Sequence, residues 1–241
     1  MIKGIFFDFG NTIIDEKPFI YGAQMGAVKY VKARLNLEET EEKLYQKLRN
    51  TPMLPAGHPY YLQPKDKEYF VRKIWMTEFA KSCGMKETGN LGEELLAAYD
   101  NGASRSDCLI DNAVKVLRDL SGDYSLCIIS NGYAGFIHAT LDFYSLRGYF
   151  KKVIISQEVN LEKPDPAIFR LALDYCGIKA AEAVMVGDSY KADVEGPGKL
   201  GMKTCWVNPE KKEPPGDKHD FMVKSIGELP AILYNFKEGE V

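Results

Sequence analysis

Four short stretches of the chain bring together carboxylates, a hydroxyl, a lysine and glycine-containing backbone. They are DFGNT with Asp8 and Gly10, IISNG with Ser130, Asn131 and Gly132, EKPDPAIF with Lys163, and VGDSYKAD with Asp188 and Asp193. Each stretch alone has a common structural explanation, because aspartate and serine at a strand end often cap a helix or form a turn. All four together, in this order, indicate a single site.

The three aspartates of these stretches predict a bound cation. Asp8, Asp188 and Asp193 would repel one another at close range unless a cation lay between them. Hard oxygen ligands, with water in the remaining positions, suit Mg²⁺. Lys163, Ser130 and backbone N–H groups could hold the oxygens of a phosphate. With that charge neutralised, one aspartate could act as the nucleophile and form an aspartyl-phosphate.

The elements that must position these residues follow from alternating short apolar runs and helical patterns. The runs predict strands over 4–8, 125–130, 152–155, 183–186, 203–207 and 221–223. The patterns between them predict helices over 112–120, 135–143, 166–175, 191–200 and 226–236. This alternation is typical of an α/β fold, a doubly wound, mostly parallel sheet with helices on both faces. Ligands of such sheets bind beyond the carboxyl ends of the strands, where all four stretches fall.

The region between the first strand and residue 108 has a different pattern. Apolar residues recur at helical spacing over 21–35, 38–48, 65–81 and 91–99, and strand-like alternation is scarce. The proline-rich stretch 51–64 predicts an irregular connection in the middle. We therefore expect an α/β core domain of residues 1–15 and 108–241, and an inserted helical cap domain of residues 16–107.

The four stretches resemble the four motifs of the haloacid dehalogenase (HAD) superfamily. DFGNT is similar to motif I (DxDGT), IISNG to motif II, Lys163 in EKPDPAIF to motif III, and VGDSYKAD to motif IV (GDxxxxD). The resemblance covers 1–15 and 108–230, and the helical insert is similar to the C1-type cap of the family. It implies a HAD hydrolase with a Rossmann-like core.

The resemblance also implies a role for each motif residue. Asp8 would be the nucleophile. Mg²⁺ would be held by the Asp8 carboxylate, the backbone carbonyl of Gly10 and the Asp188 carboxylate, and Asp193 would support the metal waters or Lys163. Ser130 and Lys163 would bind the phosphoryl oxygens, together with the backbone that follows Ser130 at Asn131 and Gly132.

Gly10 departs from motif I. In the phosphatases of the family this position holds a second aspartate, which protonates the leaving group and then activates water. Glycine removes that general acid–base, a contribution of about 10²–10⁴-fold. Asn11, where the family has glycine, tolerates a positive φ, so the turn can still form. Asp15 and Glu16 follow at the start of the insert and could swing over the site, although a turn or hinge role is favoured for Asp15.

Several chemistries tolerate a missing acid. They are a phosphatase with a good leaving group, a 2-haloacid dehalogenase, and a phosphonatase-like hydrolase that uses a cap lysine. A catalytically weak relative that binds a phosphorylated ligand is a fourth alternative. The acidic pair Asp188 and Asp193 favours a Mg²⁺-dependent phosphatase, because dehalogenases of the family do not need a metal. The expected substrate is a small phosphorylated metabolite.

Composition bounds the remaining classes. The 241 residues are 45% hydrophobic and 27% charged with a net charge of −3, which is ordinary for a globular protein and gives no basic footprint for nucleic acid. There is no apolar run of the roughly 18 residues that a membrane span needs, and we expect a cytoplasmic protein. The five scattered cysteines predict reduced thiols. The sequence does not predict an oligomeric state.

Overall fold

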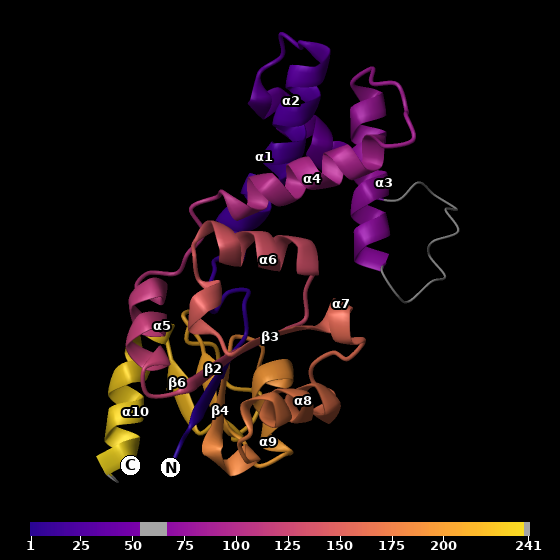
Figure 1. The fold of residues 1–241 in the computed structure, drawn as a ribbon. Helices are drawn as coiled ribbons and strands as arrows, with labels where there is room; N and C mark the ends of the chain where they lie inside the picture. The colour runs from indigo at the N-terminus through magenta and orange to yellow at the C-terminus, as the bar shows by residue number, and fades with distance from the viewer. Residues whose placement is uncertain (54–66, 239–241) are drawn as a thin grey trace. The chain divides into compact units, whose positions relative to one another are not determined.

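The computed structural model describes residues 1–53 and 67–238 (Figure 1). Most of the proline-rich stretch therefore lies outside the described residues. Backbone contacts divide the chain into two compact units. Unit 1 comprises Met1–Glu16, Cys108–Ala134 and Tyr144–Val241, and unit 2 comprises Lys17–Asp107 and Gly135–Phe143. The sequence placed residues 135–143 in the core domain, whereas the contacts group them with the helical unit.

Unit 1 is built on a six-stranded sheet. The strands are β1 (Gly4–Phe7), β2 (Ser125–Ser130), β3 (Lys152–Ile155), β4 (Ala183–Gly187), β5 (Lys203–Val207) and β6 (Phe221–Val223). All neighbouring pairs are parallel, and the order is β3-β2-β1-β4-β5-β6. The predicted α/β class with a parallel sheet is confirmed.

The strand order reverses beside β1. The chain runs from β1 outward through β2 and β3, and β4 then returns to the other side of β1. All four residues of β1 are buried, as expected for a strand flanked on both edges in a parallel sheet. Because ligands of open α/β sheets bind at such a reversal, the carboxyl ends of β1 and β4 are where a site is expected.

Helices cover both faces of this sheet (Figure 1). The helices of unit 1 are α5 (Ala113–Ser121), α7 (Ser156–Val159), α8 (Pro166–Cys176), α9 (Gly196–Gly198) and α10 (Leu229–Glu238). Helix α5 contacts β2 and α10, whereas α8 contacts β2 and β3. Phe6, Ile129 and Met185 of the sheet pack with Phe169 and Leu173 of α8 in one buried cluster.

Local sequence explains why α8 begins and ends where it does. The Asp165 side chain accepts from the N–H of Ala167, and Pro166 occupies the first helical turn, where its missing N–H is not needed. Gly177 ends the helix with a φ of 68°, the left-handed conformation typical of a glycine C-cap. The start of α8 fixes the loop that carries Lys163.

The single helix predicted over 191–200 is wrong. A π-helical turn, η4 (Tyr190–Glu195), is followed by the short helix α9. The N–H of Gly196 donates to the carbonyl of Lys191, five residues earlier, and Pro197 has no N–H to continue a regular ladder. The wider turn holds Asp193, so the departure from a regular helix lies at the site itself.

Unit 2 is helical in its described part. Its helices are α1 (Glu16–Leu35), α2 (Glu41–Asn50), α3 (Lys67–Ser82), α4 (Leu91–Ser104) and α6 (Ala134–Phe143), with α1 and α6 each starting one residue earlier, in unit 1. Val28 and Val31 of α1 and Phe79 of α3 are fully buried.

Among the described helices of the protein, none is long and apolar enough to cross a membrane. The five cysteines are free thiols, four of them buried.

Candidate active site

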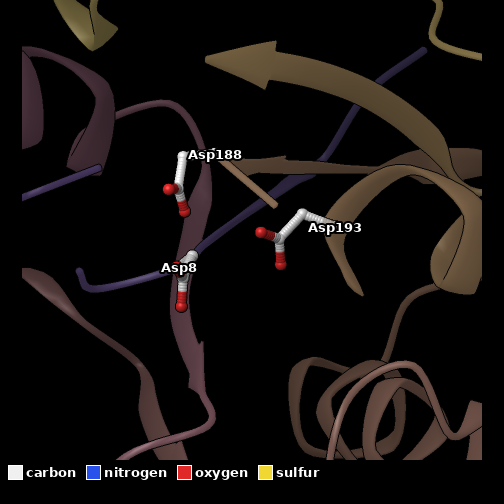
Figure 2. A group of neighbouring side chains, drawn as sticks. All are labelled: Asp8, Asp188 and Asp193. Carbon is white, nitrogen blue, oxygen red and sulfur yellow. The ribbon is translucent and has the colours of Figure 1, made fainter. Parts of the chain in front are cut away.

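Three aspartates meet at the carboxyl ends of β1 and β4 (Figure 2). Asp8 directly follows β1, Asp188 directly follows β4, and Asp193 lies in η4. Phe7 pairs with Val186 in the sheet, and the N–H of Asp8 donates to the Val186 carbonyl at 2.8 Å. One carboxylate oxygen from each aspartate lies within 4.8 Å of the others. The sheet register therefore places three negative charges in one small volume.

Lys163 joins two of these carboxylates. Its Nζ donates to Asp8 Oδ1 at 2.8 Å and to Asp193 Oδ1 at 2.6 Å. The Lys163 side chain is 2% exposed, and that of Asp193 is fully buried. Burial lowers the pKa of Lys163, but the carboxylates of Asp8 and Asp193 outweigh it and raise the pKa above its ordinary value. The lysine is thus a fixed, protonated cation beside Asp8.

The side chain of Asn131 positions the backbone of Lys163. Asn131 Nδ2 donates to the Lys163 carbonyl at 2.8 Å, and Asn131 Oδ1 accepts from the Lys163 N–H at 2.7 Å. The sequence assigned Asn131 to phosphate binding, and this reciprocal pair is a contact that it did not predict. The residue next to Ser130 therefore ties the end of β2 to the loop before α8.

Asp193 is held by backbone on two sides. The N–H of Ser189 donates to Asp193 Oδ2 at 3.0 Å. A Cβ built on Gly187 would lie 2.3 Å from Asp193 Cγ, so the carboxyl group lies directly against the glycine backbone. Burial raises the pKa of Asp193, and the Lys163 ammonium opposes this effect. Gly187 and Asp193 of the VGDSYKAD stretch are therefore close in space as well as in sequence.

Asp188 has a different environment on the opposite side of the cluster. Its carbonyl accepts from Trp206 Nε1 at 2.9 Å, which fixes the backbone. Its carboxylate accepts from Asn11 Nδ2 at 3.3 Å. Burial raises the pKa of Asp188, the charge of Asp8 raises it further, and the hydrogen bond from Asn11 lowers it. Asn11 has a φ of 50°, the positive value that the sequence led us to expect.

The remaining predicted residues lie near these aspartates in the fold. Ser130 is buried at the end of β2, the strand beside β1. Gly132 lies in the turn between β2 and α6, and Gly10 lies in the turn after Asp8 and forms an isolated bridge with Ile14. All of them belong to unit 1. Structure thus places the Asp8, Lys163, Asp188 and Asp193 side chains in one group, with Ser130 at the neighbouring strand end.

The donor set fits a divalent cation with oxygen ligands. Three carboxylates face one lysine, so the group keeps an excess of negative charge, and burial makes that excess costly. Carboxylates and backbone carbonyls are the ligands that Mg²⁺ prefers. Burial raises the pKa of Asp188 and the charge of Asp8 raises it further, so a cation beside these carboxylates would stabilise their ionised forms.

The fold and the carboxylate cluster define a hydrolase of the HAD class. Residues 5–207 match the haloacid dehalogenase-like hydrolase family, and the chain belongs to it. This confirms the resemblance that the four motifs carry.

Individual relatives cover nearly the whole chain. The chain is 26% identical to N-acylneuraminate-9-phosphatase of Mus musculus over 235 residues, 96% of this chain and 94% of that protein. It is 30% identical to glyceraldehyde 3-phosphate phosphatase of Methanothermobacter thermautotrophicus over 245 residues, 97% of this chain and all of that protein. The structure of 2-haloacid dehalogenase from Pseudomonas syringae pv. tomato DC3000 superposes with a TM-score of 0.73, at 25% identity, over 98% of this chain and all of that one.

Proposed function

We propose that this protein is a Mg²⁺-dependent phosphatase of the HAD type that hydrolyses a small phosphorylated metabolite through an aspartyl-phosphate on Asp8. The observation that carries the proposal is the position of the Asp8 carboxylate, hydrogen-bonded to Lys163 and grouped with Asp188 and Asp193. A nucleophilic carboxylate needs its target's negative charge neutralised, and the Lys163 ammonium and a cation held by the carboxylates would both supply that charge beside Asp8.

Each residue has a definite part in this proposal. The Asp8 and Asp188 carboxylates and the Gly10 carbonyl would hold Mg²⁺, which would supply charge neutralisation for the phosphoryl oxygens. Lys163 binds a phosphoryl oxygen and donates a hydrogen bond to Asp8, while Asp193 keeps Lys163 in place. Ser130 and the backbone of Asn131 and Gly132 bind the remaining phosphoryl oxygens. Asn131 acts in addition through its side chain, which positions Lys163.

The bonds formed and broken follow from these positions. A carboxylate oxygen of Asp8 attacks phosphorus, and the ester P–O bond breaks as the leaving oxygen takes up a proton. Water then attacks the same phosphorus, the bond to Asp8 breaks, and the carboxylate is regenerated as the water proton passes to a base. Neither Asp8 nor Lys163 is that proton source, because Asp8 is the nucleophile and Lys163 stays protonated beside Asp8 and Asp193.

Relatives and site chemistry together favour phosphoryl transfer over dehalogenation. Two relatives that align over almost the full chain are phosphatases, although a superposed structure is a 2-haloacid dehalogenase. Displacing halide from a neutral carbon needs no cation beside the nucleophile. The partly buried carboxylate of Asp188 would then be a cost without a function, whereas a phosphate needs the cation that it attracts.

The test is phosphate release from acetyl phosphate and from a panel of sugar and nucleotide monophosphates, with Mg²⁺ and with EDTA. We expect Mg²⁺-dependent turnover that Asp8→Asn abolishes and that Asp119→Asn, an exposed residue of α5, leaves unchanged. No release above the Asp8→Asn background would refute the proposal. Halide release from a 2-haloacid in EDTA would replace it with the dehalogenase, and ligand-dependent stabilisation without turnover would replace it with the binding relative.

A further inference from the structure

The space where a side chain at residue 10 would begin is filled by another acid. A Cβ built on Gly10 would lie 2.2 Å from Glu16 Oε1, 2.9 Å from Glu16 Cδ and 3.2 Å from Glu16 Cγ. These three atoms belong to one side chain, so the Glu16 carboxyl group lies over the backbone of Gly10. A carboxyl group is therefore present beside residue 10, although residue 10 itself carries none.

Two hydrogen bonds with Asn11 hold Glu16 in this place. Asn11 Nδ2 donates to Glu16 Oε2 at 3.2 Å, and the N–H of Glu16 donates to Asn11 Oδ1 at 3.3 Å. Asn11 Nδ2 also donates to Asp188 Oδ2 at 3.3 Å. One amide group thus links Glu16 to Asp188, and Asp188 lies within 4.8 Å of Asp8 by their carboxylate oxygens.

The backbone just before Glu16 is tied to the core of unit 1. The N–H of Asp15 donates to the Cys108 carbonyl at 2.7 Å, and the N–H of Ile110 donates to the Ile13 carbonyl at 3.0 Å. Ile14 forms isolated bridges with both Gly10 and Leu109. The turn therefore folds back on itself, and Glu16 is brought to residue 10 by fixed backbone.

We propose that Glu16 is the general acid–base of this enzyme. This inference rests on the proposed phosphatase function. The Glu16 carboxyl group donates its proton to the leaving oxygen as the ester P–O bond breaks. The resulting carboxylate then accepts a proton from the water that attacks phosphorus, which restores the carboxyl group when the bond to Asp8 breaks. Glycine at residue 10 leaves room for this carboxyl group, because a side chain there would push Glu16 aside.

A purely structural role for Glu16 makes a different prediction. Glu16 is the first residue of α1, where a carboxylate interacts favourably with the helix dipole. Such a role would lower the melting temperature on substitution and would reduce turnover of all substrates by the same factor. A proton donor instead affects substrates according to the basicity of the group that leaves.

The experiment compares Glu16→Gln with the wild type on alkyl phosphates and on acetyl phosphate, whose leaving group needs no proton. We expect kcat/KM on alkyl phosphates to fall by about 10²–10⁴-fold, and kcat/KM for acetyl phosphate to change far less. Asp15→Asn, at the neighbouring exposed acid, should give no such split. The inference is wrong if Glu16→Gln lowers kcat/KM equally on both substrate classes, or if Asp15→Asn shows the same difference between them. In either case, turnover by the wild type would leave the phosphatase proposal intact.

A rescue experiment guards against a misfolded variant. Gly10→Asp alone should lower activity, because its Cβ would meet Glu16 Oε1 at 2.2 Å. In a Glu16→Ala background that obstacle is absent, so Gly10→Asp should restore part of the alkyl phosphatase activity that Glu16→Ala has lost. If Gly10→Asp has the same effect in both backgrounds, residues 10 and 16 do not share one function and the inference is wrong. If the wild type releases no phosphate from any substrate, the phosphatase proposal itself fails.

Discussion

The carboxyl group of Asp193 lies against the backbone of Gly187, and a Cβ on Gly187 would overlap it at 2.3 Å. Gly187 is the last residue of β4, and Asp193 lies one π-helical turn further along the chain. The absence of a side chain at Gly187 therefore lets Asp193 reach Lys163, which in turn reaches Asp8. The position of the Asp8 nucleophile therefore depends on Gly187, a residue that contributes no chemical group to the site.

Gly187→Ala should consequently reduce activity strongly. The methyl group must displace Asp193 Cγ and Oδ2, which are buried and hydrogen-bonded, and we expect a loss of about 1–3 kcal/mol in the free energy of unfolding, as for other overpacked sites. Urea unfolding and phosphate release measure the two effects. Gly122→Ala is the matched control, because a Cβ there meets nothing within 4 Å. Equal behaviour of the two variants would contradict this account.

Lys163→Met should destabilise the apo protein by about 3–5 kcal/mol, since it leaves buried carboxylates without their cation. Adding Asp193→Asn to Lys163→Met should recover part of that loss, because one of the two unpaired charges is removed. Urea unfolding in EDTA measures both. Lys3→Met, which breaks an exposed ion pair with Glu182, should cost at most about 1 kcal/mol. A loss as small as this in Lys163→Met would show that the buried pair does not hold the site.

Magnesium should raise the melting temperature in a concentration-dependent way. At a Mg²⁺ concentration 100 times the dissociation constant, the free energy of unfolding should increase by about 2.7 kcal/mol. Asp188→Asn should abolish this response and leave the apo protein equally or more stable, because it removes a charge that Asp8 repels. Thermal unfolding with and without Mg²⁺ measures both the magnesium response and the stability of the apo protein. A full magnesium response in Asp188→Asn would remove that residue from the metal site.

Asp100 in unit 2 should make stability depend on pH. Burial raises its pKa to about 6, Arg72 opposes this, and Asp100 Oδ1 has no hydrogen-bond partner. The folded state then binds more protons than the unfolded state between about pH 4 and pH 6, so this carboxyl's contribution to stability falls as pH rises through that window.

Asp100→Asn should therefore be more stable than the wild type at neutral pH, by on the order of 1 kcal/mol for a partly exposed group. The difference should shrink below about pH 4, where the wild-type carboxyl is neutral in both states. Paired melting curves across this range isolate Asp100, because the other titrating groups are shared. A difference that is independent of pH would contradict the assignment.

Much of the sheet and the identity of the acidic cluster could be predicted from the sequence. All six predicted strands are present, with β1 ending one residue earlier and β4 one residue later than expected. Buried parallel strands appear in a sequence as short continuous apolar runs, which stand out between helical patterns. Because parallel strands end at a common edge, the order of Asp8, Ser130, Lys163 and Asp188 was enough to place them near one another.

The contacts that pair side chains with distant backbone could not be predicted in this way. The reciprocal hydrogen bonds between Asn131 and Lys163 join residues 32 positions apart, and no local pattern selects that partner. The sequence pattern around Asp193 predicts an ordinary α-helix, because one wider π-helical turn leaves the spacing of the apolar residues almost unchanged. Glu16 was visible as a nearby acid, but its place over Gly10 depends on the left-handed turn at Asn11.

The central place of β1 in the sheet has a consequence for synthesis of the protein. Both of its neighbours, β2 and β4, are encoded more than 100 residues downstream, so β1 leaves the ribosome long before either partner exists. One edge of β1 stays unpaired until the chain has been extended through β2 at residue 130, and the other until it has been extended through β4 at residue 187. Contacts of such long sequence separation slow folding and expose aggregation-prone surface. Asp8 can meet Asp193 only after that wait, so truncated or stalled chains would carry the nucleophile without a site.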